Sequence, residues 1–278
     1  MDSLLAFILQ AEINYKSVWK GRYIMAISIG EIKQILNQSS FTDLPEVMKQ
    51  YEADERAGVK NELKKAKARL QKYEQEKERT YALSEYERKY ADYMHICGID
   101  EVGRGPLAGP VVAGAVILPK DCDILYINDS KQLSEKKREE LYDIIMEKAV
   151  AVSVGYASVE RIDEINILQA TYEAMRDAIS KLPVSPDILL NDAVTIPQVT
   201  IPQIPIIKGD AKSISIGAAS IIAKVTRDRL MVEYDSVFPE YGFASNKGYG
   251  SAAHIEAIKK NGPCPIHRRS FIDNFING

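Results

Sequence analysis

Residues 98–110 read Gly98-Ile99-Asp100-Glu101-Val102-Gly103-Arg104-Gly105-Pro106-Leu107-Ala108-Gly109-Pro110. Two adjacent carboxylates precede a turn that contains three glycines, one arginine and two prolines, and apolar runs flank the stretch. Consecutive side chains of a strand point to opposite faces, so Asp100 and Glu101 can share a site only where a strand ends and the backbone bends. We therefore expect a strand that ends at this pair, with the glycines supplying the bend.

The neighbouring acids and glycines suit a hard cation beside exposed backbone amides. Mg2+ and Mn2+ prefer oxygen ligands, commonly one or two carboxylates completed by water and phosphate. Glycine lets backbone N–H groups come close to a sugar or a phosphate, and Arg104 can pair with anionic oxygens. A solvated strand end would explain the same two acids, and this simpler interpretation is favoured while the stretch is considered alone.

The composition is that of an ordinary globular protein. The chain has 278 residues, 46% hydrophobic and 27% charged, enough for one large domain or a catalytic domain with an appendage. The apolar stretch at residues 111–118 is far shorter than the roughly 20 residues of a membrane helix, so we expect none. The net charge of −3 is unlike that of a basic nucleic-acid-binding protein, so any such binding must rest on a local patch.

The N-terminal residues 1–24 show no clear periodicity, and a fresh pattern begins at Met25. We hypothesise that Met25 is the natural initiator. The apolar residues 4–9 follow Asp2 instead of a cationic segment, so no secretory signal is expected. The three scattered cysteines predict a reducing, cytoplasmic compartment and no structural zinc; they are Cys97, Cys122 and Cys264.

Residues 52–89 are dense in charge and almost free of glycine and proline, which predicts one or two helices. An apolar stripe spaced by four and three residues is expected to dock on the rest of the protein; it consists of Val59, Leu63, Ala66, Leu70 and Tyr73. Between Lys60 and Arg79, eight cationic side chains stand against four acidic ones. This basic stretch is either a solvated face or an accessory handle for a polyanion.

Apolar runs typical of strands alternate with helical segments from His95 onward. We expect strands near residues 95–100, 111–118, 149–157, 187–191 and 204–207. We expect helices near residues 134–147, 168–181, 213–234 and 252–261. This order predicts an α/β fold with a mixed five-stranded sheet covered by helices. The helix from Ser213 is small and apolar nearly all round, so it must lie buried against the sheet, with its charged end at Arg227, Asp228 and Arg229 emerging toward solvent.

Two further acids stand at predicted strand ends. Asp192 follows the strand at 187–191, and Asp210 follows the strand at 204–207. The segment between them is rich in proline and glutamine and can bring the two strand ends side by side. Four carboxylates without histidine or cysteine suit two hard divalent ions on a phosphate. Taken alone, Asp192 is better explained as an exposed strand-end acid and Asp210 as a helix cap.

The stretch at residues 98–110 resembles the signature of bacterial ribonuclease HII, the type 2 ribonuclease H. The resemblance continues to the C-terminus, with the motifs in the family's order. The further matching segments are Asn128-Asp129-Ser130-Lys131-Gln132-Leu133-Ser134, Lys208-Gly209-Asp210-Ala211-Lys212-Ser213, Ala219-Ser220-Ile221-Ile222-Ala223-Lys224-Val225-Thr226-Arg227-Asp228, Lys247-Gly248-Tyr249-Gly250 and Pro265-Ile266-His267-Arg268.

The resemblance implies a ribonuclease H-like catalytic domain in residues 93–278, after a helical N-terminal extension in residues 1–92. It implies a metal-dependent endoribonuclease that hydrolyses RNA strands paired to DNA. Such an enzyme also incises 5′ to single ribonucleotides embedded in duplex DNA, leaving 5′-phosphate and 3′-hydroxyl ends, and so serves ribonucleotide excision repair. A cytoplasmic monomer that acts on these nucleic acids is expected.

The resemblance also assigns site residues. Two Mg2+ or Mn2+ ions would be held by Asp100, Glu101, Asp192 and Asp210. The 2′-hydroxyl at the junction would be contacted by Gly103, Arg104 and Gly105, and Tyr249 would pack near the sugar on the DNA side. Phosphates would be touched by Lys131, Lys224 and Lys247, unless these lysines are simply solvated. Ala193 follows the third acid where many family members have glycine, so the assignment of Asp192 rests on its strand and on its spacing from Asp210.

Two alternatives stay open. Type 3 relatives usually carry lysine or threonine in place of Arg104, which favours type 2, although their larger N-terminal domain keeps them in view. A catalytically silent nucleic-acid-binding protein could use residues 60–79 for contact, but it would have no physical need for four acids. His267 is interpreted as structural, and no partner pattern is visible for His95 or His254.

Overall fold

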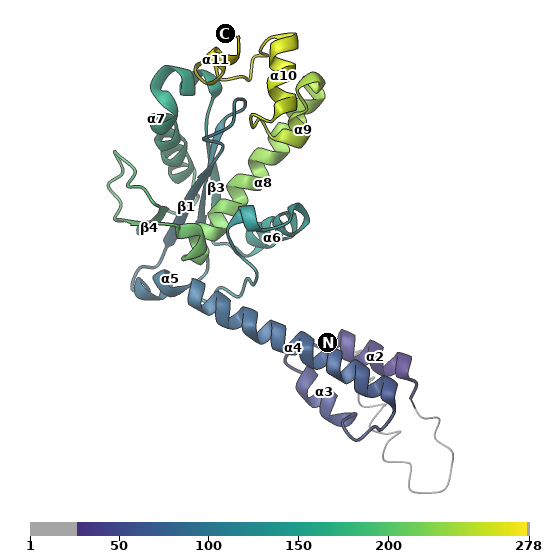
Figure 1. Ribbon diagram of the computed structural model, residues 1–278. Helices are drawn as coiled ribbons and strands as arrows, with labels where there is room; N and C mark the ends of the chain where they lie inside the picture. Colours follow the sequence, from purple (N-terminus) through teal and green to yellow (C-terminus); the bar gives the residue numbers. More distant parts are fainter. Residues whose placement is uncertain (1–26, 277–278) are drawn as a thin grey trace, which may run out of the picture. The chain divides into compact units, whose positions relative to one another are not determined.

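The computed structural model describes residues 27–276 (Figure 1). The hypothesis about Met25 concerns residues outside this range. The chain divides into two compact units, the first ending at Gln75 and the second beginning at Glu76. The helices of the first unit are α2 (Ile29–Gln38), α3 (Leu44–Gln50) and the first part of α4 (Ala57–Leu83).

The first unit has its own apolar core, in which the stripe of α4 packs against α2 and α3. Its buried residues are Ile32, Leu36, Leu44, Val47, Val59 and Ala66. Tyr73 stacks on Phe41 with ring centroids 4.0 Å apart. Arg69 donates to the carbonyl oxygens of Leu36 and Asn37 at the end of α2. The expected docking of the stripe is confirmed, and its partners are two helices that the sequence pattern does not predict.

The second unit contains a five-stranded sheet in the order β3-β2-β1-β4-β5. The strands are β1 (Ile96–Val102), β2 (Val111–Ile117), β3 (Ala151–Ala157), β4 (Ile188–Asp192) and β5 (Gln203–Ile206). β2 pairs antiparallel with β1 and β3, whereas β4 pairs parallel with β1 and β5. The predicted mixed five-stranded sheet is therefore confirmed.

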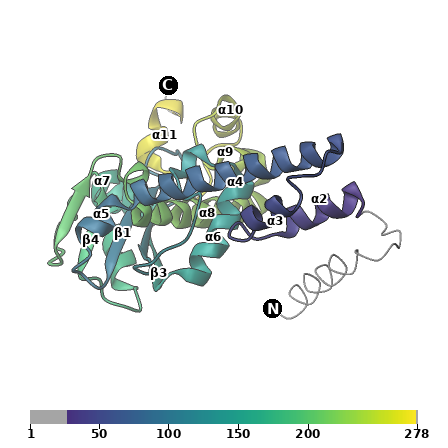
Figure 2. The same ribbon diagram turned by 90° about the horizontal axis from the view of Figure 1, so that it is seen from below.

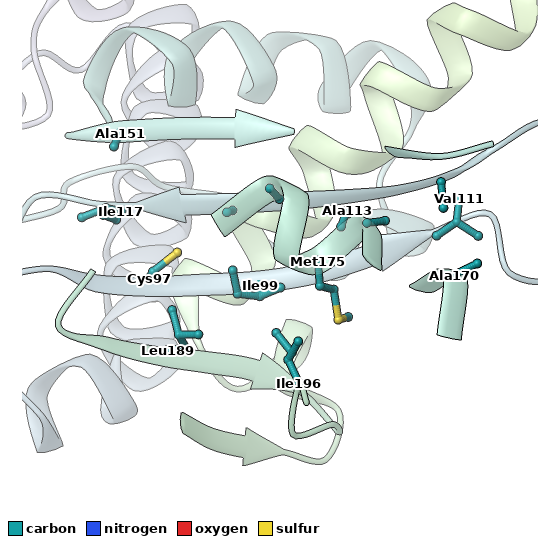
Figure 3. Close-up of a cluster of buried hydrophobic side chains, with 14 of the residues drawn as sticks. Cys97, Ile99, Val111, Ala113, Ile117, Ala151, Ala170, Met175, Leu189 and Ile196 are labelled. Carbon is teal, nitrogen blue, oxygen red and sulfur yellow. The ribbon is translucent and has the colours of Figure 1, made fainter. Parts of the chain in front are cut away.

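Helices cover both faces of the sheet (Figures 1 and 2). They are α6 (Glu135–Lys148), α7 (Val159–Ser180) and α8 (Ile214–Val237). Ala113, Ala115 and Ile117 of β2 pack in the cluster with α7, while Val116 packs in the cluster with α6 and α8. This alternation is the one expected of a strand with both faces buried. Figure 3 shows Cys97 and Ile99 of β1 in the α7 cluster with Met175.

α8 approaches the sheet so closely that β1 needs a glycine beneath it. A Cβ atom on Gly98 would lie 2.1 Å from the backbone carbonyl carbon of Ser215. The prediction that this helix of small, apolar residues is buried is confirmed. The expectation that its charged end emerges toward solvent is wrong for Arg227, which is 0% exposed, and for Asp228, which is buried against Lys224. Only Arg229 of the three has an exposed side chain.

The remaining elements are short helices. They are α5 (Glu85–Lys89), α9 (Phe243–Asn246), α10 (Ala252–Asn261) and α11 (Arg269–Ile276), with 3₁₀ turns η1 (Ser130–Gln132), η2 (Gly209–Ala211) and η3 (Pro239–Tyr241). α7 begins at Val159, earlier than expected, because Ser158 caps it and a kink at Asn166 interrupts its pattern. Among the residues described, no helix has the length and apolarity needed to cross a membrane.

Candidate active site

Asp100 and Glu101 lie inside β1, which continues to Val102. The expectation that the strand ends at this pair is wrong. What ends is the pairing with β4, whose last partners are Ile99 and Asn191, whereas β2 accompanies β1 to Val102. The sheet therefore opens beside the two acids. Asp100 is 7% exposed, and Glu101 lies near enough for Arg104 Nη1 to donate to its Oε1 at 3.3 Å.

The parallel pairing of β4 with β5 brings Asp192 and Asp210 to the same edge of the sheet. Asp192 ends β4 opposite Ile206, and Asp210 lies in η2 directly after β5. The backbone N–H of Gly209 donates to Asp192 Oδ1 at 2.7 Å, which ties the two segments together. The expected convergence of these strand ends is confirmed.

The carboxyl groups act on each other electrostatically. Burial, and then repulsion from Glu101, raises the pKa of Asp100 well above its ordinary value. Burial raises the pKa of Glu101, which the guanidinium of Arg104 partly offsets. Burial followed by repulsion from Asp129 and Asp192 raises the pKa of Asp210. The arrangement thus concentrates negative charge in a poorly solvated place.

The hydroxyl of Ser220 holds Asp100 and is itself bound by Ser130, and neither role was predicted from the sequence. The Ser220 hydroxyl of α8 hydrogen-bonds to the Asp100 carboxylate. Ser220 Oγ also lies 2.9 Å from Ser130 Oγ, and both serines are buried. This chain joins the segment of Asp129 and Lys131 to β1 through α8. Both serines lie within the motifs that carry the resemblance, but the spacing does not show that they meet.

The donor set fits a hard divalent cation, because it offers only carboxylate oxygens. As the side chains lie, no three histidine, cysteine or acidic groups in residues 27–276 form a ready metal cage. The mutual repulsion of the carboxyls is nevertheless the kind of strain that a bound cation relieves. Rotation of the side chains, with water filling other positions, is needed to complete a site.

The glycine turn begins directly after β1. Gly103 has φ +92°, in the left-handed region that favours glycine, and a Cβ there would lie 2.3 Å from Arg227 Nε. Arg104 is half exposed. Tyr249 is 44% exposed, and its Cε1 lies 4.0 Å from the position of a Cβ on Gly105. The structure therefore brings together the turn and Tyr249, which are far apart in sequence.

The three predicted lysines lie in different surroundings. Burial raises the pKa values of Glu101 and Asp210, and the positive charge of Lys131 partly offsets both rises, so Lys131 lies near the carboxyls. Lys224 Nζ donates to Asp228 Oδ1 at 2.7 Å and is largely buried. Lys247 Nζ donates to the Ala244 carbonyl oxygen. Of the three lysines, Lys131 is the one whose charge acts on both Glu101 and Asp210.

Two histidines support the backbone of Tyr249. His254 Nδ1 lies 2.8 Å from the Tyr249 carbonyl oxygen, and His254 Nε2 lies 3.0 Å from His267 Nε2. The Cys264 N–H donates to His267 Nδ1, so the network assigns a neutral tautomer to each ring. The structural interpretation of His267 agrees with this placement. The pairing with His254 was not visible in the sequence.

Comparison with known proteins shows which proteins this chain is similar to. The family model described as ribonuclease HII matches residues 97–274, and that of the ribonuclease HII N-terminal domain matches residues 28–91. The chain is 69% identical over 253 residues to a protein named ribonuclease HII from Lachnoclostridium phytofermentans, covering 91% of this chain and 100% of the relative. It is 50% identical over 251 residues to one from Clostridioides difficile, covering 90% of this chain and 98% of the relative.

Two solved structures are similar to about two thirds of this chain. Ribonuclease H2 from Pyrococcus horikoshii OT3 aligns with a TM-score of 0.56 and 30% identity, over 66% of this chain and 98% of its own. The RNase HII of Archaeoglobus fulgidus, solved as a complex with PCNA, aligns with a TM-score of 0.53 and 28% identity, over 65% of this chain and 96% of its own. The fold around the carboxyl cluster is thus shared with these proteins.

Proposed function

Because the chain belongs to the ribonuclease HII family and is an endoribonuclease, we propose that it hydrolyses the RNA strand of RNA–DNA hybrids and incises duplex DNA 5′ to single embedded ribonucleotides. The products would be a 5′-phosphate on the ribonucleotide and a 3′-hydroxyl upstream. The proposed cellular role is ribonucleotide excision repair by a cytoplasmic monomer. The observation that carries the proposal is a cluster of mutually repelling carboxyls at the ends of adjacent strands, beside a glycine turn that faces an exposed tyrosine.

We assign the metal to the carboxyl cluster. The ligands of two Mg2+ or Mn2+ ions would be Asp100, Glu101, Asp192 and Asp210. When bound, such ions lower the pKa of water and neutralise charge on the phosphate. The residues of the chain provide the rest: Ser220 orients Asp100, and the Gly209 N–H orients Asp192. The Asp129 carboxylate beside Asp210 adds to the negative charge that favours cation uptake.

The turn provides the recognition of the sugar. Within residues 27–276, the backbone N–H groups of Arg104 and Gly105 donate to no other protein group. A 2′-hydroxyl is both a donor and an acceptor, so it can accept from such an amide. Arg104 is exposed enough to pair with a phosphate, and the Tyr249 ring can stack on the sugar of the DNA side.

Lysines would steer the phosphates. Lys131 has the strongest support, because its charge already acts on two of the acids. Lys224 and Lys247 remain part of the proposal, although Lys224 is held by Asp228. In the first unit, Lys64, Lys67 and Lys72 of α4 are exposed, and we propose this basic stretch as an accessory nucleic-acid handle. Residues 1–92 would then be the helical extension and residues 93–278 the catalytic domain.

Cleavage by the Asp192→Asn variant tests the proposed site. The substrate is a labelled RNA–DNA hybrid with Mg2+ or Mn2+, and the wild type is expected to cut the RNA strand. The cleavage rate of Asp192→Asn should be at least about 100-fold below that of the wild type, because removing one group that stabilises transition-state charge commonly has an effect of this size. The matched control is Asp121→Asn, an exposed aspartate without an ion pair among the described residues. Full activity in Asp192→Asn would mean that the third ligand is misplaced.

A further inference from the structure

Two arginines are buried behind the glycine turn, and the proposed chemistry does not use them. The side chains of Arg227 in α8 and Arg268 before α11 are each 0% exposed. Neither forms an ion pair with a carboxylate in residues 27–276. Both instead donate to backbone carbonyl oxygens. Burying a guanidinium without a counter-ion is expensive, so the hydrogen bonds to these carbonyl oxygens must offset that cost.

Arg268 holds the carbonyls of the turn. Its Nε and Nη2 donate to the Gly109 carbonyl oxygen at 2.9 and 2.7 Å. Its Nη1 donates to the Arg104 carbonyl oxygen at 3.0 Å, and Nη2 also donates to that of Gly103. Burial and the nearby Arg227 lower the pKa of Arg268 to about 9, which leaves it charged at neutral pH. One planar fork therefore fixes both ends of the turn.

Arg227 ties the turn to the segment that carries Tyr249. Its Nε and Nη2 donate to the carbonyl oxygens of Pro110 and Ala108, each at 3.0 Å. Its Nη1 donates to the Lys247 carbonyl oxygen at 2.9 Å. The Leu107 N–H donates to the Gly248 carbonyl oxygen at 2.8 Å, which adds a direct link. Arg227 and this backbone hydrogen bond together fix the segment of Tyr249 beside the turn.

The orientation of the turn has a chemical consequence. Because Arg268 binds the carbonyl oxygens of Gly103 and Arg104 on the inside, the next N–H groups are left without protein partners. These are the amides of Arg104 and Gly105, on the stretch beside Tyr249. A lysine could keep the charge, but it cannot reproduce a planar fork with five donors.

We propose that Arg268 and Arg227 are positioning residues for sugar discrimination. Arg268 orients the turn so that the amides of Arg104 and Gly105 can reach the 2′-hydroxyl. Arg227 holds the segment of Tyr249 beside the turn, so that the ring can contact the adjacent sugar. The proposal rests on the proposed function, since it assigns how the same site tells a ribonucleotide from a deoxyribonucleotide. It predicts that the arginines act on selectivity and not on the carboxyl cluster.

The test is the ratio of two Kd values. Binding is measured in Ca2+ to two duplexes that differ only in one 2′-hydroxyl, with a gel to check that both stay intact. A ratio from one preparation is independent of the folded fraction. Arg268→Lys and Arg227→Lys should each reduce the wild-type preference about fivefold, which corresponds to about 1 kcal/mol. The surface variants Arg269→Lys and Arg229→Lys are the matched controls and should keep the preference.

The possible results distinguish a failure of the proposed function from a failure of the proposed role of the two arginines. A wild type that binds both duplexes equally would contradict the proposed function. A preference that survives in both buried-arginine variants would overturn the role of the arginines alone. If neither variant folds, the amide NMR signals of wild-type Arg104 and Gly105 decide: they should shift with the ribonucleotide duplex and not with the all-DNA duplex. Equal shifts with both duplexes would overturn the proposal.

Discussion

The ring of Tyr249 faces Gly105, with Cε1 4.0 Å from the position that a Cβ atom on the glycine would occupy. This separation is ordinary van der Waals contact, and Gly105 does not have a positive φ. The protein itself therefore has room for a methyl group at residue 105. Any loss caused by that methyl group would report on the approach of the substrate.

Gly105→Ala should fold normally and cleave poorly. We expect its free energy of unfolding to stay within about 0.5 kcal/mol of wild type, as at an unstrained surface position. Its kcat/KM on a ribonucleotide-containing duplex should fall at least about tenfold, equivalent to about 1.4 kcal/mol of barrier. Urea unfolding and initial-rate kinetics on one preparation measure both quantities. Wild-type kcat/KM would show that the sugar does not approach this residue.

Gly103→Ala, in contrast to Gly105→Ala, should destabilise the fold. Its φ of +92° is unfavourable for alanine, and the added Cβ would lie 2.3 Å from Arg227 Nε. A left-handed conformation alone costs about 1–2 kcal/mol, and the clash adds to it. We expect a clear loss in urea stability. An unfolding curve that superimposes on the wild type would contradict the tight packing of Arg227 against the turn.

The buried histidine pair should make stability depend on pH. Burial, together with repulsion from His254, lowers the pKa of His267 to about 4. The folded state then binds fewer protons than the unfolded state between pH 4 and pH 6.5, so the contribution is present above pH 6.5 and is lost as the pH falls toward 4. The lowered pKa of His267 contributes about 3 kcal/mol to the free energy of unfolding when fully present. The stability difference between wild type and His267→Gln should shrink over this window.

His95→Gln is the control for this titration, since His95 is partly exposed beside Asp187. Thermal or urea unfolding at several pH values gives each difference. A difference between wild type and His267→Gln that is constant from pH 7 to pH 4 would rule out a neutral, buried pair.

Ser220→Ala should weaken cation binding by releasing Asp100. The serine hydroxyl binds Asp100 and lies 2.9 Å from Ser130 Oγ. Loss of such an orienting partner commonly costs about tenfold or more in metal affinity. Calorimetric titration with Mn2+, without nucleic acid, measures it. Ser236→Ala on the same helix, whose hydroxyl donates to the Glu233 carbonyl oxygen, should leave the affinity unchanged.

Residues 76–92 should stabilise the catalytic domain. Leu83 is buried in the cluster with α6 and α8, and Glu87 Oε1 accepts from the Ser213 hydroxyl and the Ser215 N–H. Loss of one buried leucine alone typically costs about 2–5 kcal/mol. We therefore expect fragment 93–278 to be less stable than fragment 76–278 by about 2 kcal/mol or more in urea. Equal stability would show that the contacts of Leu83 and Glu87 do not stabilise residues 93–278.

The sheet could be predicted from the sequence because each strand is an apolar run of its own. The burial of α8 followed from its small residues, and Asp192 and Asp210 were expected to meet because parallel neighbours end at one edge. The start of α7 was missed because the kink at Asn166 breaks its periodicity. α2 and α3 were also missed, since their apolar residues become a core only when α4 lies beside them.

The supports of the site could not be predicted in the same way. Arg227 donates to the carbonyl oxygen of Pro110, which is 117 residues away in the sequence. Arg268 donates to that of Gly109, which is 159 residues away. A backbone carbonyl leaves no trace in the sequence, so nothing marks it as the partner of an arginine. His254 and His267 likewise meet only because the loop after α10 folds back.

We propose that a single 2′-hydroxyl decides whether a duplex is cleaved. The most direct measurement uses two labelled DNA duplexes that differ only in a single ribonucleotide, with the full-length wild type and Mg2+ or Mn2+. We predict a single cut on the 5′ side of the ribonucleotide, with a 5′-phosphate on it, and no cut in the all-DNA duplex. No cleavage with either ion, or equal cleavage of both duplexes, would contradict the account.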